Sequence, residues 1–126
     1  SENYCPNGHT LINPRANFNG YPGIILKIRQ GDEEGSVALS PIFGEKARVT
    51  LDIVLRNNER IQLFCPVCDV PMPIHSPCHC GGDLLALFLN PDGDFADCVG
   101  VCDRVGCVNA SLIHSGELVS LSRLTD

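Results

Sequence analysis

The chain has 126 residues and carries 9 Lys and Arg against 15 Asp and Glu, for a formal net charge of −6. A content of 44% hydrophobic and 19% charged residues excludes a disordered chain, and the length predicts a single compact domain over residues 1–126. The acidic balance disfavours broad binding to nucleic acid or anionic membranes, which depends on Lys and Arg. The longest apolar run, Leu84–Leu89, is far shorter than the roughly 20 residues of a membrane span.

The first half of the chain predicts several short strands. Residues 1–23 are rich in Asn, Gly and Pro and are expected to be mostly loop. Apolar residues alternate over 23–30 and again over 36–40, which predicts two strands. The clearest alternation runs over 47–56, where one face is expected to carry Val49, Leu51, Ile53 and Leu55. Because Asn57 and Asn58 favour a turn, residues 47–65 are expected to form a hairpin that ends at Cys65.

The second half predicts another hairpin and an ambiguous tail. Residues 84–89 form an apolar strand, 90–94 a turn, and 95–102 the returning strand. The tail from Ser115 has Leu spacing that fits a short helix, and it fits a final strand equally well. The predicted fold class is mainly β, with small antiparallel sheets and little helix.

Eight cysteines permit either disulfides or metal sites. The first residues show no basic segment followed by an apolar one, so we expect a cytoplasmic protein. Disulfide partners can lie anywhere in a chain, whereas metal ligands come in close pairs, and most of these cysteines do. Metal binding is therefore the expected role.

The densest group of cysteines lies in the middle of the chain. It consists of a Cys-x-x-Cys pair and a Cys-x-Cys-Gly pair, namely Cys65, Cys68, Cys78 and Cys80. Two thiolates on one tight turn can reach the same ion, and four complete the tetrahedral shell of a structural Zn²⁺. These four residues are the first predicted metal site, with His75 and His79 as substitutes for Cys78. Pro71 and Pro73 exclude the helix that follows a thioredoxin-like redox pair.

These turns resemble the zinc knuckles of the zinc-ribbon and rubredoxin-like proteins, in which two metal-binding turns lie at the ends of hairpins. The resemblance covers about residues 60–102. It departs from the family where the second turn has one residue between its cysteines in place of two.

A second predicted site joins both ends of the chain. Cys5-Pro6-Asn7-Gly8-His9 opens like the first knuckle and ends in a histidine, and Cys102 and Cys107 bracket a loop after a strand. The second predicted ligand set is Cys5, His9, Cys102 and Cys107, with the knuckle at 5–9 packed against 98–107. Cys98 is expected to be either a further sulfur ligand or a small buried thiol, and His114 is expected not to bind metal.

Zinc is the default metal for such sites, and a rubredoxin-like iron is the alternative. A zinc site with four thiolates would add −2 and one with three thiolates and a histidine would add −1, which brings the net charge from −6 to about −9. Phosphate-binding loops, metalloprotease motifs and nucleophile elbows are absent from the sequence.

Three functions follow from these observations. The first is a non-catalytic zinc-binding subunit or adaptor that docks on a larger protein or enzyme complex. The second is electron transfer by a thiolate-bound iron, and the third is a small zinc hydrolase or deaminase. The first agrees best with two closed sites and with apolar segments such as Pro41-Ile42-Phe43.

Overall fold

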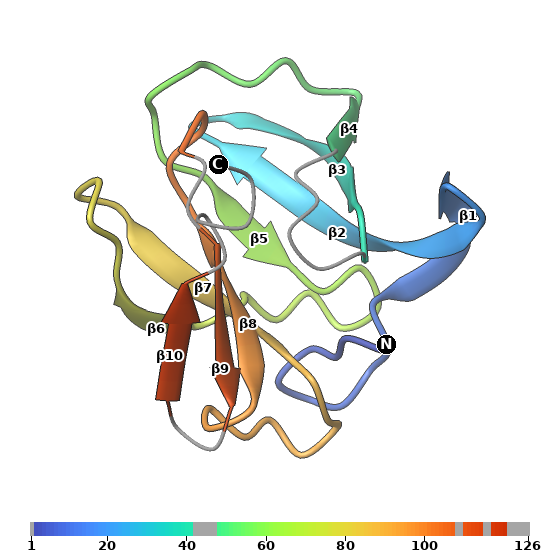
Figure 1. The fold of residues 1–126 in the computed structure, drawn as a ribbon. Helices are drawn as coiled ribbons and strands as arrows, with labels where there is room; N and C mark the ends of the chain where they lie inside the picture. Colours follow the sequence, from blue (N-terminus) through green and yellow to red (C-terminus); the bar gives the residue numbers. More distant parts are fainter. Residues whose placement is uncertain (1, 42–47, 108–109, 115–116, 121–126) are drawn as a thin grey trace.

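The computed structural model describes residues 2–41 and 48–107, and the backbone alone of 110–114 and 117–120. The predicted fold class is confirmed, since the described residues contain ten strands in two five-stranded antiparallel sheets (Figure 1). The first sheet contains β1 (Ile12–Phe18), β2 (Tyr21–Gln30), β3 (Glu33–Leu39), β4 (Arg48–Leu51) and β5 (Gln62–Phe64). The second contains β6 (Ile74–Pro77), β7 (Asp83–Phe88), β8 (Cys98–Cys102), β9 (Ala110–His114) and β10 (Glu117–Ser120).

The first sheet is organised around the long strand β2. On one edge β2 pairs with β3, and β3 in turn pairs with β4. The other edge is shared, because β1 pairs with the first half of β2 and β5 pairs with its second half. Ile28 shows this directly, since it lies opposite Gly35 of β3 and Leu63 of β5. The end of β5 is thereby fixed beside the middle of β2, and Cys65 follows directly.

The second sheet is a meander with the order β10-β9-β8-β7-β6. The predicted hairpin over 84–102 is confirmed, with pairs running from Leu84 opposite Cys102 to Phe88 opposite Cys98. The described part of the tail is a strand, because β10 pairs with β9. Of the two alternatives for the tail, the strand is therefore the one that forms over 117–120; residues 115–116 and 121–126 lie outside the described residues.

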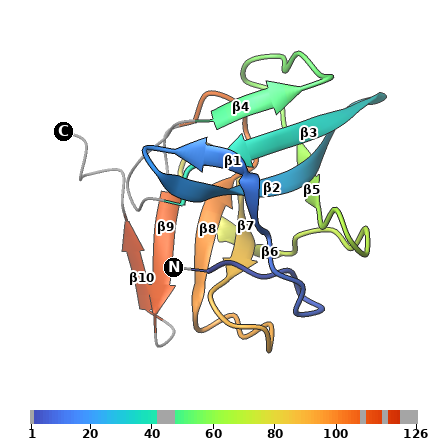
Figure 2. The ribbon, with the colours of Figure 1, turned by 90° about the vertical axis from the view of Figure 1, so that its right-hand side faces the viewer.

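The hydrophobic core lies between the two sheets, whose strands run across one another in Figure 2. Leu26 and Ile28 of β2 pack in one cluster with Leu85 and Leu87 of β7. The other face of β7 is buried as well, since Phe88 lies in a second cluster with Cys98. Strand β7 is thus buried on both faces, in keeping with its unbroken apolar sequence.

The expectation of loop over residues 1–23 is wrong for β1 and for the start of β2. The two strands are joined by Asn19 and Gly20, which have φ angles of 53° and 89°. An Asn-Gly pair with two positive φ angles is the preferred two-residue turn of a β-hairpin. That dipeptide was the sequence signal for this hairpin.

The predicted hairpin over 47–65 is also wrong, because β4 pairs with β3 whereas β5 pairs with β2. Strand β4 ends at Leu51, and Asp52 turns the chain away with a φ of 66°. The residues expected on one apolar face therefore differ in burial. Ile53 is 8% exposed, whereas Val49 and Leu51 are 54% and 62% exposed. The strands expected over 23–30 and 36–40 correspond to most of β2 and to the end of β3.

Candidate metal centres

Four turns of the chain share one hydrogen-bonding pattern around a cysteine. In each turn the sulfur accepts a hydrogen bond from the backbone N–H two residues later, at 3.3 to 3.5 Å. The cysteines are Cys5, Cys65, Cys80 and Cys102, and the donors are Asn7, Val67, Gly82 and Arg104. A hydrogen bond from an amide favours the charged form of the sulfur that accepts it. We call these turns the knuckles.

The first cluster, site I, joins the N-terminal knuckle to the knuckle that follows β5. Its members are Cys5, His9, Cys65 and Cys68, whose ligand atoms all lie within 4.8 Å of one another. The Sγ atoms of Cys5 and Cys68 are 3.9 Å apart, and His9 Nδ1 lies 3.5 Å from Cys5 Sγ. Around a tetrahedral Zn²⁺, bonds of about 2.3 Å to sulfur and 2.0 Å to nitrogen give S···S and S···N edges of about 3.8 and 3.5 Å. Both measured distances agree with that shell.

The environment of site I stabilises negative charge on its more exposed sulfur. Asn7 donates a side-chain hydrogen bond to Cys68 Sγ at 3.4 Å. This bond, with the backbone N–H of Val70, lowers the pKa of Cys68 to about 6. Burial raises the pKa of Cys65, which is 0% exposed. A cation bound among these groups would balance the negative charge of a buried thiolate and so stabilise it.

The second cluster, site II, consists of four cysteines at one end of the second sheet. Its members are Cys78, Cys80, Cys102 and Cys107, again with all ligand atoms within 4.8 Å of one another. The Sγ distances are 3.4 Å from Cys80 to Cys102 and 3.8 Å from Cys78 to Cys107. Every cysteine of the chain lies within the described residues, and none forms a disulfide. The Cys78–Cys107 distance matches the closed four-sulfur shell of a structural Zn²⁺ site, and the Cys80–Cys102 distance is shorter than the edge of that shell.

Glycine at position 82 is required by the geometry of site II. A Cβ at Gly82 would lie 2.7 Å from Asp103 Oδ1 and 3.2 Å from Cys102 Sγ. With no side chain in the way, the Gly82 N–H reaches Cys80 Sγ, and this bond is the main cause that lowers the pKa of Cys80 to about 6. Burial dominates at Cys102, where it raises the pKa of the thiol.

A polar bridge connects site II to the first sheet. The segment between Cys102 and Cys107 pairs with residues 58–61 through backbone bonds of 2.8 to 3.0 Å. Arg60 donates two hydrogen bonds to Asp103 Oδ2, at 2.9 and 2.7 Å, and a third to Asp83. Asp103 is 4% exposed, and its other oxygen accepts the Asp83 N–H at 2.9 Å. Since residue 61 leads directly into β5 and Cys65, the bridge runs from one cluster toward the other.

The eight predicted ligands are the eight residues of the two clusters, but the structure groups them differently. The four ligands predicted for the first site do not lie together, because Cys65 and Cys68 lie with Cys5 and His9. Cys78 and Cys80 lie instead with Cys102 and Cys107, and the knuckle at 5–9 shares its cluster with 65–68 rather than with 98–107.

Strand pairing explains the regrouping. Leu84 at the start of β7 lies opposite Cys102 at the end of β8, so the cysteines before β7 and after β8 meet at one end of the sheet. The sequence predicted the hairpin over 84–102, and this hairpin already implies that the cysteines before β7 and after β8 lie close together. The N-terminal knuckle is placed by long-range pairing alone, since Tyr4 bonds with Phe88, and the N–H of Ile25 donates to Leu11.

The alternative ligands belong to neither cluster of the described residues. His75 Nδ1 is 2.9 Å from Ser76 Oγ, and neither His75 nor His79 belongs to a cluster of the described residues. Cys98 is 0% exposed within the core cluster of Phe88, which agrees with a buried thiol. The side chain of His114 lies outside the described part of the chain.

Comparison with known proteins gives no match to a family model, to a curated protein or to a solved structure. The described residues include no helix with the length and apolar character needed to cross a bilayer. Two clusters of Cys and His that could each hold a metal ion, within a mainly β fold, are what sequence and structure establish about this chain.

Proposed function

We propose that this protein is a non-catalytic zinc-binding subunit or adaptor, in which two structural Zn²⁺ ions fix the surface that docks on a larger protein. One observation carries the proposal: each cluster offers four ligands from two distant segments at tetrahedral spacing. A shell filled by four protein ligands leaves no open position for a substrate or an attacking water. Soft thiolates together with one imidazole suit Zn²⁺.

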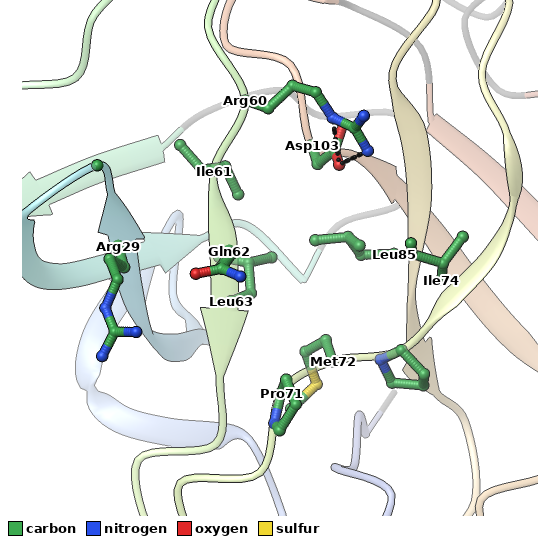
Figure 3. A pocket seen from close by; sticks show the side chains of 12 residues that line it. Arg29, Arg60, Ile61, Gln62, Leu63, Pro71, Met72, Ile74, Leu85 and Asp103 are labelled. Atoms are coloured by element: carbon green, nitrogen blue, oxygen red, sulfur yellow. Dashed lines mark hydrogen bonds and ion pairs between the residues drawn. The ribbon is translucent and has the colours of Figure 1, made fainter.

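The lining of two cavities supports a role without catalysis. A cleft of about 600 Å³ lies between β5 and β7; Leu63 and Leu85 face it, and the Arg60–Asp103 pair closes one end (Figure 3). The acid in this cleft, Asp103, is already engaged by Arg60 and the Asp83 N–H. A smaller cavity of about 100 Å³ borders Cys102 and Cys107, and the described residues that line it include no His, Asp or Glu. Neither cavity therefore offers a free general base beside a metal, which a zinc hydrolase or deaminase requires.

Charge favours a protein partner over nucleic acid. The sequence has a net charge of −6, and two zinc–thiolate centres deepen it to about −9. Several of the basic side chains are already paired with carboxylates, namely those of Lys27, Arg29, Arg56 and Arg60. Within the described part of the chain, a phosphate backbone would meet few uncompensated cations.

Elemental analysis of the purified protein tests the metal part of the proposal. We expect two zinc ions in the wild type and one in Cys68→Ser or in Cys80→Ser, each of which removes a ligand from one site. The matched control is Cys98→Ser, which should retain two ions because Cys98 belongs to neither cluster. Iron in place of zinc, with visible thiolate-to-iron absorption, would favour electron transfer over the proposed role. The absence of any bound metal would overturn the proposal.

The docking part is tested by affinity purification at the natural expression level. We expect one stoichiometric partner that stays bound to the wild type and to Cys98→Ser, and that dissociates when a chelator removes zinc. A holoprotein that elutes without a partner contradicts the adaptor role while leaving the metal sites intact.

A further inference from the structure

We propose that site II is an oxidation site, at which a peroxide joins Cys80 and Cys102 in a disulfide and thereby releases the zinc ion of that site while site I keeps its own. This inference rests on the zinc ligation of the proposed function and goes beyond it, because it assigns a reaction to two of the ligands. It does not depend on the docking partner.

The cysteines of site II are more exposed than those of site I. Three of the four site II cysteines are partly exposed, and only Cys78 is buried. In site I, Cys5 and Cys65 are both 0% exposed, which leaves Cys68 as its one partly exposed cysteine. Oxidation of cysteine follows thiolate character and exposure. A peroxide in solution is therefore expected to react first at site II, where a second exposed sulfur lies beside the first.

One pair of sulfurs in site II lies closer together than the ligands of a zinc ion do. The Sγ atoms of Cys80 and Cys102 are 3.4 Å apart, whereas the edge of a four-sulfur shell around Zn²⁺ is about 3.8 Å. Two other Sγ pairs, one in each site, lie 3.8 and 3.9 Å apart. Because the S–S bond of a disulfide is about 2.0 Å long, Cys80 and Cys102 need less movement to form one than either of those pairs.

A small cavity gives a peroxide access to one sulfur of this pair. The cavity of about 100 Å³ borders Cys102 and Cys107, and most of the residues that line it are aliphatic. A water molecule takes up roughly 30 Å³ in the liquid, so neutral hydrogen peroxide, which has one more oxygen atom, fits this volume. Arg104 also lines the cavity, and its guanidinium donates a hydrogen bond to the carbonyl of Cys80 at 2.7 Å. A cation beside the pair stabilises the hydroxide that leaves during the reaction.

The reaction is a two-electron oxidation of two thiolates by hydrogen peroxide. The thiolate of Cys102 attacks one peroxide oxygen, the O–O bond breaks, and a sulfenic acid and a hydroxide form. The thiolate of Cys80 then attacks the sulfur of the sulfenic acid, which forms the S–S bond and releases a second hydroxide. Two protons from solvent convert both hydroxides to water. The two thiolates that remain in site II are too few for a closed zinc shell, so the ion leaves.

Opening of site II changes the end of the second sheet and leaves the other site in place. Cys102 is followed directly by Asp103, whose carboxylate accepts the hydrogen bonds of Arg60 that link site II to the first sheet. A disulfide is reduced again by thiols, so the change is reversible. Oxidation thereby regulates the surface that zinc is proposed to fix.

Hydrogen peroxide added to the zinc-loaded protein tests the proposal, with a chromophoric chelator that reports released zinc. We expect one ion to leave at least about tenfold faster than the other, with a protein mass about 2 Da lower. Mass spectrometry of the digested protein should show a peptide that links Cys80 to Cys102. Dithiothreitol followed by zinc should restore two ions.

A ligand exchange separates the reaction from zinc binding. Cys80→His keeps four ligands in site II, as His9 does in site I, but removes the sulfur that completes the disulfide. We expect this variant to hold both ions in peroxide at least about tenfold longer than the wild type. The matched control is Cys68→His in site I, which should lose its site II zinc as fast as the wild type does. If a variant fails to fold, the disulfide map of the wild type still decides.

The zinc content before treatment distinguishes the two proposals. A protein that holds no zinc at that point refutes the proposed function and this inference together. A protein that holds two ions before and after peroxide refutes this inference alone. Equal rates of release from both sites, or a disulfide between other cysteines, overturn it as well.

Discussion

The Sγ atoms of Cys5 and Cys68 lie 3.9 Å apart, although 63 residues separate them in the sequence. Between them the chain completes the whole first sheet. The other cluster spans a shorter stretch, with Cys80 Sγ 3.4 Å from Cys102 Sγ across a separation of 22 residues. The two clusters thus secure different parts of the molecule: site I fixes the N-terminal segment to the end of β5, and site II closes one end of the second sheet.

Metal removal is expected to unfold the protein. Burial raises the pKa values of Cys65 and Cys102, so these sulfurs are poor thiolates without a cation beside them. Structural zinc sites supply roughly 10–16 kcal/mol of apparent binding free energy, which equals or exceeds the total stability of an ordinary domain. We expect chelation to abolish the β circular dichroism signal and added zinc to restore it. Retention of the spectrum and of the thermal midpoint without metal would show that the clusters are not structural.

Substitution of Gly82 is expected to damage site II. Gly82→Ala places a Cβ 2.7 Å from the Asp103 carboxylate and 3.2 Å from Cys102 Sγ. Crowding of this kind costs roughly 1–3 kcal/mol in free energy of unfolding, and it should also weaken zinc binding. The control is Gly81→Ala, whose Cβ would meet no atom within 4 Å; its φ of 95° leaves only backbone strain. Denaturant unfolding and chelator competition compare the two variants, and equal zinc affinities would refute the steric argument.

The Arg60–Asp103 pair is expected to contribute more stability than the surface pairs of Arg56. Arg60→Leu leaves the carboxylate of Asp103, which is 4% exposed, without its cation. Loss of one partner from a buried pair costs about 3–5 kcal/mol, and half-exposure of Arg60 reduces that figure to about 2 kcal/mol. Arg56→Leu removes only exposed contacts to Glu33 and Glu59 and should lower the free energy of unfolding much less than Arg60→Leu does. Urea unfolding of both variants measures the difference.

The two metal sites are expected to be coupled. Cys107→Ser opens site II and loosens the segment that pairs with 58–61 and leads into Cys65. We expect the remaining zinc in site I to bind about tenfold more weakly than in the wild type, a coupling free energy of about 1.4 kcal/mol. Competition with a chromophoric chelator measures this affinity, and Cys98→Ser serves as the control. An unchanged site I affinity would mean that the bridge through Arg60 and Asp103 carries no coupling.

Cys98 is expected to react slowly in the folded protein. Burial, together with the nearby charges of Asp97 and Asp94, raises its pKa to about 11. Because the raised pKa keeps the sulfur protonated at neutral pH, alkylation should be very slow there and should accelerate as the pH rises toward 11. Mass spectrometry after iodoacetamide treatment locates the label. Rapid labelling of Cys98 at pH 7 in the zinc-loaded protein would contradict the buried position.

The knuckle residues themselves could be recognised from the sequence, because a knuckle is a local structure. Cys65 and Cys68 follow a short strand and are separated by two residues, and Cys5 and His9 bracket an equally tight turn with Pro and Gly. The hairpin over 84–102 was equally visible, since its apolar strand and its Asn-Pro-Asp-Gly turn are adjacent in the chain. Local spacing, however, cannot tell which two knuckles share an ion.

Sequence alone therefore determined the mainly β class, the eight candidate ligands and the acidic charge, all of which depend on composition or on residues a few positions apart. Tertiary structure decided the grouping of the knuckles, the separation of β4 from β5 and the exposure of Val49 and Leu51. The physical reason is the same in each case. Long-range strand pairing determines which two knuckles lie together. Because β5 pairs with β2 and not with β4, β4 remains at the margin of its sheet.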